Sequence, residues 1–143
     1  ILLLIIVVSS SCSSNTTFNN FYKDHQEDSD FSFGLSSSLV ASFLSDEDAE
    51  DIKPLLKKAK HVRILVFTEQ AEDKTAAFQK FINRSKFEKM VKIKDDEDQL
   101  AFFTLEKDDR IREIALEISS GDELVLLGLK TNLSQTDLEE LVN

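Results

Sequence analysis

The sequence predicts an α+β fold, a two-layer sandwich built on a largely antiparallel meander sheet with helices packed on one face. Three segments between residues 87 and 118 show the period of two that is typical of half-buried strands, residues 124–129 form a near-continuous apolar strand, and only short turns separate the four. Residues 73–84 instead repeat apolar side chains at helical spacing, so this segment has an apolar helical face to bury. The 143 residues, 41% hydrophobic and 31% charged, suffice for one domain with its own core.

The first elements expected in the folded part are one strand and two helical segments. Residues 31–35 alternate large apolar side chains with serine and glycine, which indicates a half-buried strand. Residues 39–44 and 52–59 space their apolar side chains as a helix does. Ser45 and Asp48 match a capping box between the two segments.

A buried strand and the clearest helix follow. Residues 62–67 are β-branched, aliphatic and aromatic without alternation, which predicts a strand covered on both faces. The helix predicted over residues 73–84 buries the apolar face formed by Ala77, Phe78, Phe81 and Ile82. Its outer face is expected to carry Lys74, Lys80 and Arg84.

The meander and a last helix complete the domain. Its four strands are predicted over residues 87–93, 100–105, 112–118 and 124–129. The turns between them are predicted at residues 95–98, 107–110 and 119–122. Ser134 and Asp137 cap the final helix, and Leu133 and Leu138 occupy the two positions of a hydrophobic staple.

The chain begins with an unbroken apolar run over residues 1–8 that is too short to span a bilayer. Its length suits the apolar part of a secretory signal peptide, and three serines lead from it to Cys12. This arrangement resembles a bacterial lipobox, in which the cysteine is acylated and the chain is cut before it. We therefore expect a truncated lipoprotein signal peptide over residues 1–11 and lipidation at Cys12. The alternatives are a secreted chain with an idle thiol and an N-terminal strand.

Three regions follow from this interpretation. Residues 1–11 are the signal peptide, residues 12–29 are a flexible tether rich in Ser, Asn, Thr and Asp, and residues 30–143 are a single α+β domain. Three aromatic residues interrupt the tether, and they either pack on the domain or lie at the membrane surface; these are Phe18, Phe21 and Tyr22.

The order of these elements resembles that of domain of unknown function family 4252, a group of small lipoproteins from Gram-negative bacteria. The matching segments are Ile52-x-x-Leu55-Leu56, Val62-x-Ile64-Leu65, Phe78-x-x-Phe81, Phe87-Glu88-Lys89-Met90-Val91 and Leu127-Gly128-x-x-x-x-Leu133-Ser134-x-x-Asp137-Leu138. The resemblance covers roughly residues 30–143. It implies this fold and a lipid-anchored place in the cell envelope, and it implies no activity, substrate or cofactor.

The resemblance also bears on which side of the outer membrane the domain faces. In lipoproteins of this type, export to the cell surface is associated with acidic residues directly after the lipidated cysteine. The first acidic residue after Cys12 is Asp24. We therefore expect a domain anchored in the outer membrane that faces the periplasm.

Composition excludes several classes of partner and cofactor. The chain has 17 basic and 27 acidic residues, a net charge of −10, which argues against nucleic acid as a partner. A single cysteine excludes disulfides and multi-cysteine metal sites. His25 and His61 lack a histidine or cysteine one helical turn away and are expected to be solvated, so we expect no zinc. A calcium loop starting at Asp95 would place Leu100 where an EF-hand needs glycine. We expect no cofactor.

The sequence contains no recognisable catalytic constellation. Three carboxylates could in principle pair on the sheet, but they are more simply its polar face; these are Glu69, Glu113 and Glu117. Two hypotheses about function follow. The first is a lipid-anchored cell-envelope protein with a non-catalytic binding or assembly domain that has an envelope protein partner. The alternative is an envelope enzyme that uses carboxylates on the open face of the sheet.

Charge is unevenly distributed along the chain. Residues 61–94 carry eight basic and four acidic side chains, whereas residues 95–143 carry four basic and fourteen acidic ones. The basic residues concentrate on one helix and the strand after it, as Lys74, Lys80, Arg84, Lys86, Lys89, Lys92 and Lys94. Such a cluster could form a patch for anionic lipid or an acidic partner. The simpler interpretation is a solvated face that balances its acidic neighbour.

Overall fold

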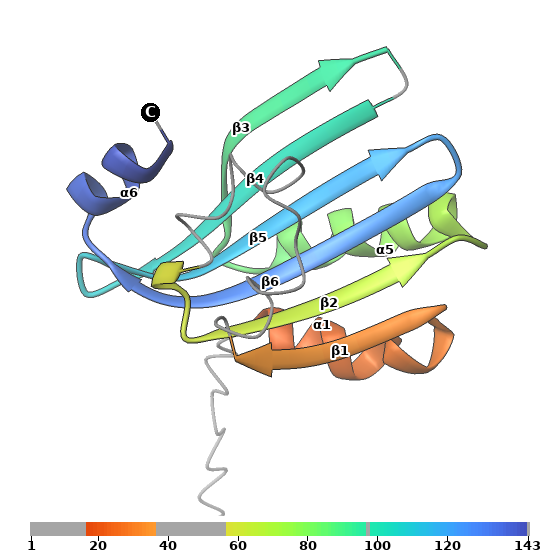
Figure 1. Ribbon diagram of the computed structural model, residues 1–143, viewed down its shortest axis with the longest axis horizontal. Helices are drawn as coiled ribbons and strands as arrows, with labels where there is room; N and C mark the ends of the chain where they lie inside the picture. The colour runs from red at the N-terminus through yellow and green to blue at the C-terminus, as the bar shows by residue number, and fades with distance from the viewer. Residues whose placement is uncertain (1–16, 37–56, 97, 143) are drawn as a thin grey trace, which may run out of the picture.

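The computed structural model of the chain describes residues 17–36, 57–96 and 98–142. Their elements are α1 (Phe18–His25), η1 (Gln26–Asp28), β1 (Phe31–Ser36), β2 (His61–Phe67), α5 (Ala71–Arg84), β3 (Glu88–Asp95), β4 (Asp98–Lys107), β5 (Arg110–Ser120), β6 (Glu123–Leu133) and α6 (Gln135–Val142). The strands form one six-stranded sheet in the order β1-β2-β6-β5-β4-β3, and every neighbouring pair is antiparallel (Figure 1). The predicted α+β class is confirmed.

Tight turns set the register of the meander. Asp108 and Asp109 both adopt positive φ, 56° and 60°, between the paired residues Lys107 and Arg110. Positive φ at both central residues defines the turn whose twist matches a hairpin, and aspartate tolerates that conformation better than most residues. Gly121 supplies a positive φ of 57° in the turn between β5 and β6. The turns predicted at these two places are confirmed.

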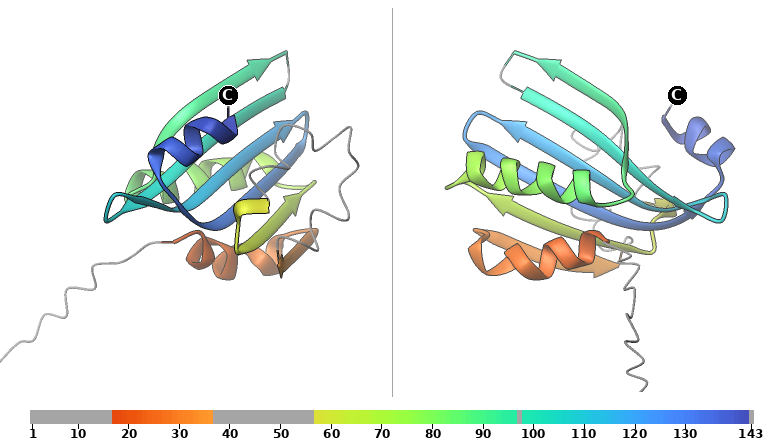
Figure 2. Two further views of the ribbon diagram at one scale, coloured as in Figure 1. Left: turned by 60° about the vertical axis from the view of Figure 1, so that its left-hand side comes forward. Right: turned by 180° about the vertical axis from the view of Figure 1, so that it is seen from behind.

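Side chains alternate between two apolar layers along the central strands. On β6, Leu124 and Leu126 face the layer beneath α1 and α5, while Leu127 and Leu129 face the opposite side of the sheet. Figure 2 shows α1 and α5 side by side on one face of the sheet. The layer beneath these two helices is rich in aromatic residues, among them Phe18, Phe21, Phe67, Phe78, Phe81, Phe87 and Phe103.

Helix α6 packs on the opposite face of the sheet from α1 and α5, so the helices do not all lie on one face as predicted. Leu138 is buried there together with Leu133, as expected of a hydrophobic staple. The predicted capping box is also confirmed, because the Ser134 N–H donates to Asp137 Oδ2 and the Asp137 N–H donates to Ser134 Oγ, both at 3.0 Å. These bonds from Ser134 hold the pKa of Asp137 below its usual value.

The prediction of a flexible tether over residues 12–29 is wrong for its second half. Helix α1 and η1 lie within that range, and Phe18 and Phe21 are only 2% and 3% exposed. The physical reason is that the sheet has space for an aromatic ring at Gly128, which lacks a side chain, and the Phe18 ring packs there. Of the two possibilities for these aromatic residues, packing on the domain is the one observed.

Several predictions lie outside the described residues. These concern the signal peptide over residues 1–11, lipidation at Cys12, the helical segment over residues 39–44 and most of that over residues 52–59. Among the described helices, none combines the length and the apolar character needed to cross a bilayer.

Candidate functional site

The structure gathers six of the seven predicted basic residues on one surface. Their side chains are exposed, and they belong to the second half of α5, the connection after it and the edge strand β3. We call this the α5–β3 surface, formed by Lys80, Arg84, Lys86, Lys89, Lys92 and Lys94. Lys89 and Lys92 pair across β4 with Phe103 and Ala101, which belong to the layer beneath α5, so both lysines lie on the α5 side of the sheet.

Lys89 and Lys92 of the α5–β3 surface act on the buried Glu117, since burial raises the pKa of that carboxyl and the charges of the two lysines lower it. Among the described residues, none of the six makes an ion pair. Two large apolar side chains on the same strand are also solvent-exposed, Met90 at 44% and Ile93 at 54%. The strand is bulged between Lys89 and Val91. Positive charge and exposed apolar area therefore occur together along one edge of the sheet.

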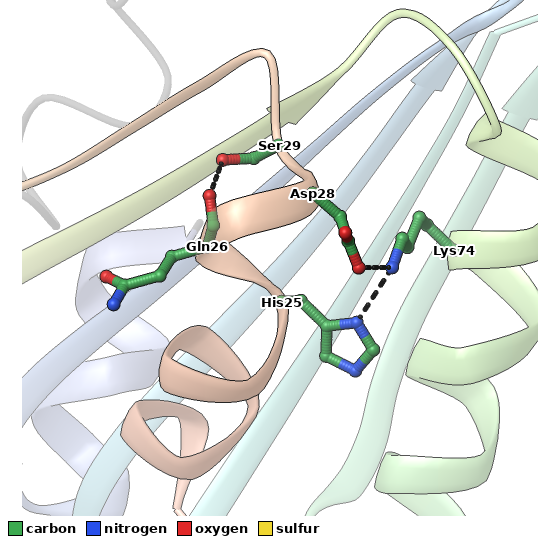
Figure 3. Close-up of polar contacts among 5 residues, drawn as sticks. All are labelled: His25, Gln26, Asp28, Ser29 and Lys74. Carbon is green, nitrogen blue, oxygen red and sulfur yellow. Dashed lines mark hydrogen bonds and ion pairs between the residues drawn. The ribbon is translucent and has the colours of Figure 1, made fainter.

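Lys74 does not belong to this surface, and its prediction on the outer face of the helix is wrong. It is 8% exposed and lies between α5 and α1. Its Nζ donates to Asp28 Oδ2 at 2.8 Å and lies 3.1 Å from His25 Nδ1 (Figure 3). The Nζ also lies 5.6 Å from the centre of the Phe67 ring. Lys74 is one helical turn before Phe78, and this spacing could have predicted that both share the inner face.

His25, predicted to be solvated, is half-buried. Its ring stacks on Phe21 at 4.1 Å, and an ammonium group can only donate, so Nδ1 accepts the bond from Lys74. Burial, and next the neighbouring charge of Lys74, lower the pKa of His25, while Asp24 and Asp28 act in the opposite direction. The hydrogen bond from Lys74 lowers the pKa of Asp28. This cluster therefore fastens the end of α1 to α5.

The candidate catalytic carboxylates are separated. Glu113 and Glu117 lie on β5 beneath α1 and α5, so their expected position on the open face of the sheet is wrong. Glu113 accepts the Phe18 N–H at 3.3 Å, and Glu117 accepts the Gln79 side-chain N–H at 2.7 Å. Burial raises the pKa of both. Four residues of one strand separate them by about 13 Å, so they cannot act on one substrate atom. Glu69 lies apart from them, exposed, after β2.

A surface hollow beside the start of α5 does not involve these two carboxylates. It encloses about 760 Å³ between the start of α5 and the turn from β5 to β6, and Glu72, Asp73, Asp122 and Glu123 are among its lining residues. The hollow lacks Glu113 and Glu117, the two carboxylates whose pKa is raised. Within the described ranges, no group of three or more His, Cys, Asp or Glu side chains is placed to hold a metal ion.

These features define a small single-sheet α+β domain with a basic surface at one edge of its sheet. The chain belongs to the family described as Domain of unknown function (DUF4252), whose model matches residues 22–141. The family expected from the order of elements is thus confirmed, and the match begins inside α1. No curated protein and no solved structure matches the chain.

Proposed function

We propose that this protein is a lipid-anchored component of the cell envelope whose domain acts by binding an acidic protein partner. The observation that carries the proposal is the α5–β3 surface, with six exposed cations and no ion pair among the described residues. On a chain with a net charge of −10, such a surface is a local exception. Complementary charge speeds the encounter with a partner and selects its orientation. Met90 and Ile93 are exposed apolar side chains of the same edge strand. Ile93, which pairs with Leu100, faces the side of the sheet opposite to Lys89 and Lys92, so a partner would cover it only by reaching around the β3 edge.

The described carboxylates support binding over catalysis. A pair of catalytic acids must reach the same substrate, and a raised pKa is useful only where the acid faces that substrate. Glu113 and Glu117 instead bond to Phe18 and Gln79, residues of the two covering helices. Their raised pKa values therefore have a structural cause.

The anchor is proposed at Cys12, with the domain on the periplasmic side of the outer membrane. Because α1 begins at Phe18, only five residues separate the cysteine from the fold. A chain of that length spans at most about 20 Å, so the acyl group and the domain stay close together. The acidic residues that follow, from Asp24 on, lie in or after α1, not in this short link.

Metabolic labelling with a fatty-acid analogue tests the anchor. Label should be incorporated into the wild-type chain and be absent from the Cys12→Ala variant. Label that persists in the variant would show that acylation does not occur at Cys12. Protease added to intact cells should spare the domain and should digest it only after the outer membrane is permeabilised; digestion in intact cells would place the domain outside.

Crosslinking and capture from envelopes tests the binding surface. The variant Lys80→Glu/Lys89→Glu should lose a captured partner that the wild type retains, because it reverses two charges on the α5–β3 surface. The matched control, Lys23→Glu/Lys107→Glu, makes the same change in net charge at two exposed lysines elsewhere. Equal loss in both variants would show that only net charge matters, and would contradict a specific α5–β3 site.

A further inference from the structure

Acidic residues gather at one end of the sheet. The antiparallel order brings the start of β1, the connection from β2 to α5 and the turns β3–β4 and β5–β6 to the same end. The exposed acidic residues found there are Asp30, Glu69, Glu72, Asp73, Asp96, Asp98, Asp122 and Glu123. This end of the domain is therefore repelled by a negatively charged surface.

The opposite end, where β2 begins and β6 ends, carries exposed charges of both signs. Lysines lie beside β2 and β6, whereas the acidic residues lie at the β4–β5 turn and in α6, as Glu106, Asp108, Asp109, Asp137, Glu139 and Glu140. The backbone N–H of Lys60 donates to the carbonyl oxygen of Lys130 at 2.7 Å, which fixes these two residues side by side. Lys58 precedes Lys60 by two residues and is also exposed. Its charge, like that of Arg110, helps to lower the pKa of Asp137. We call Lys58, Lys60 and Lys130 the exit surface.

The chain enters the domain beside the exit surface. Phe18 and Asn19, the first residues of α1, line a small cavity together with His61, Arg63 and Lys130. Figure 2 shows α1 beginning toward the same end of the sheet as the last turn of α5. The five residues that separate Phe18 from Cys12 thus start from this surface.

We infer that the exit surface lies against the anionic phospholipid headgroups of the bilayer that holds the anchor. The inference rests on the proposed lipidation of Cys12, because the anchor brings this end of the domain to within about 20 Å of the membrane. A link this short lets the lysines come within a Debye length of the headgroups, about 8 Å, where basic residues are attracted to the anionic surface, and the acidic end of the sheet then points away from the membrane. The α5–β3 surface lies at the β3 edge of the sheet, away from β1 and β2. It therefore stays available to a protein partner.

Vesicle co-sedimentation tests this orientation on a full chain that carries Cys12→Ser and therefore no acyl group. The vesicles contain phosphatidylcholine alone or equal parts of phosphatidylcholine and phosphatidylglycerol. Residues 1–8 are the same in every variant, so any contribution they make to vesicle binding cancels when the variants are compared. Each basic residue near an anionic surface strengthens binding about fivefold, so Lys58→Gln/Lys60→Gln/Lys130→Gln should weaken binding to anionic vesicles about a hundredfold.

The matched control is Lys80→Gln/Lys89→Gln/Lys94→Gln, which has the same net charge and should keep nearly wild-type binding. Thermal unfolding of both variants should match the wild type, because all six lysines are exposed. Equal weakening in the two variants, or a wild-type chain with no preference for anionic vesicles, would overturn the inference. Either result would leave the acyl label at Cys12 unaffected, so the anchor and the orientation are tested separately.

Discussion

Substituting Gly128 by alanine should detach the start of α1 from the sheet. A Cβ on Gly128 would lie well inside 3.0 Å of the Phe18 ring, where no real contact occurs. The backbone of β6 cannot yield, because it is paired with β2 on one side and with β5 on the other. In an ordinary strand the change from glycine to alanine is favourable, since it reduces the entropy of the unfolded chain. A destabilising effect would therefore come from Phe18 alone.

The expected loss in the free energy of unfolding is about 3 kcal/mol. Exposing a phenylalanine side chain that is 2% accessible costs about 2 kcal/mol of apolar burial. The hydrogen bond from the Phe18 N–H to the buried Glu113 carboxylate is lost with it, which costs about 1 kcal/mol more. For a domain of this size the midpoint of thermal unfolding should fall by about 10 °C.

Thermal and denaturant unfolding of a double-mutant cycle measures this effect. Phe18→Ala alone should also destabilise the domain, but Gly128→Ala should cost little more once the ring is absent, so the two changes should be strongly non-additive. Gly34→Ala is the control, because its Cβ would meet mainly the flexible Arg63 side chain at 3.3 Å. A neutral Gly128→Ala, or additive effects in the cycle, would refute the packing of Phe18 on Gly128.

Three further predictions concern titration and capping. Burial raises the folded-state pKa of Glu117. The stability that this group contributes is therefore present at low pH and is lost as the pH rises through that pKa. The variant Glu117→Gln should raise the midpoint of thermal unfolding at pH 7 and leave it nearly unchanged at pH 4. The folded-state pKa of His25 is lowered, so its contribution to folding stability is present above about pH 6.5 and is lost as the pH falls. The variant His25→Phe keeps an aromatic ring on Phe21. It should lose less stability than the wild type between pH 7 and pH 5. Ser134→Ala should cost about 1 kcal/mol in denaturant unfolding, and no change would contradict the capping box seen at α6.

Regular spacing made most of the sheet predictable from sequence. The strands from β2 to β6 alternate or run continuously in apolar residues, and short turns with aspartate or glycine limit how they can pair. The capping box at Ser134 and Asp137 was predictable for the same reason, since it depends only on residues near in sequence. The order of the helices and strands along the chain was enough to indicate the family.

Contacts between distant segments were not predictable in the same way. Helix α1 is short and polar in composition, and its burial depends on Gly128, which is 110 residues from Phe18 in the sequence. Lys74 is an apparent surface residue until α1 and η1 cover it and supply His25 and Asp28 as its partners. The α5–β3 surface was largely predictable because its residues lie on two elements that follow one another in the chain.

Site-specific crosslinking in intact cells tests most directly whether the domain binds a partner through the α5–β3 surface. A photo-crosslinking residue would replace Lys89 on that surface or Asp122 at the acidic end of the sheet; both positions are exposed. Position 89 should give a discrete crosslinked product that disappears when Lys80→Glu is added, and position 122 should give none. Absence of a product at position 89, or an equal product at both positions, would contradict binding through the α5–β3 surface.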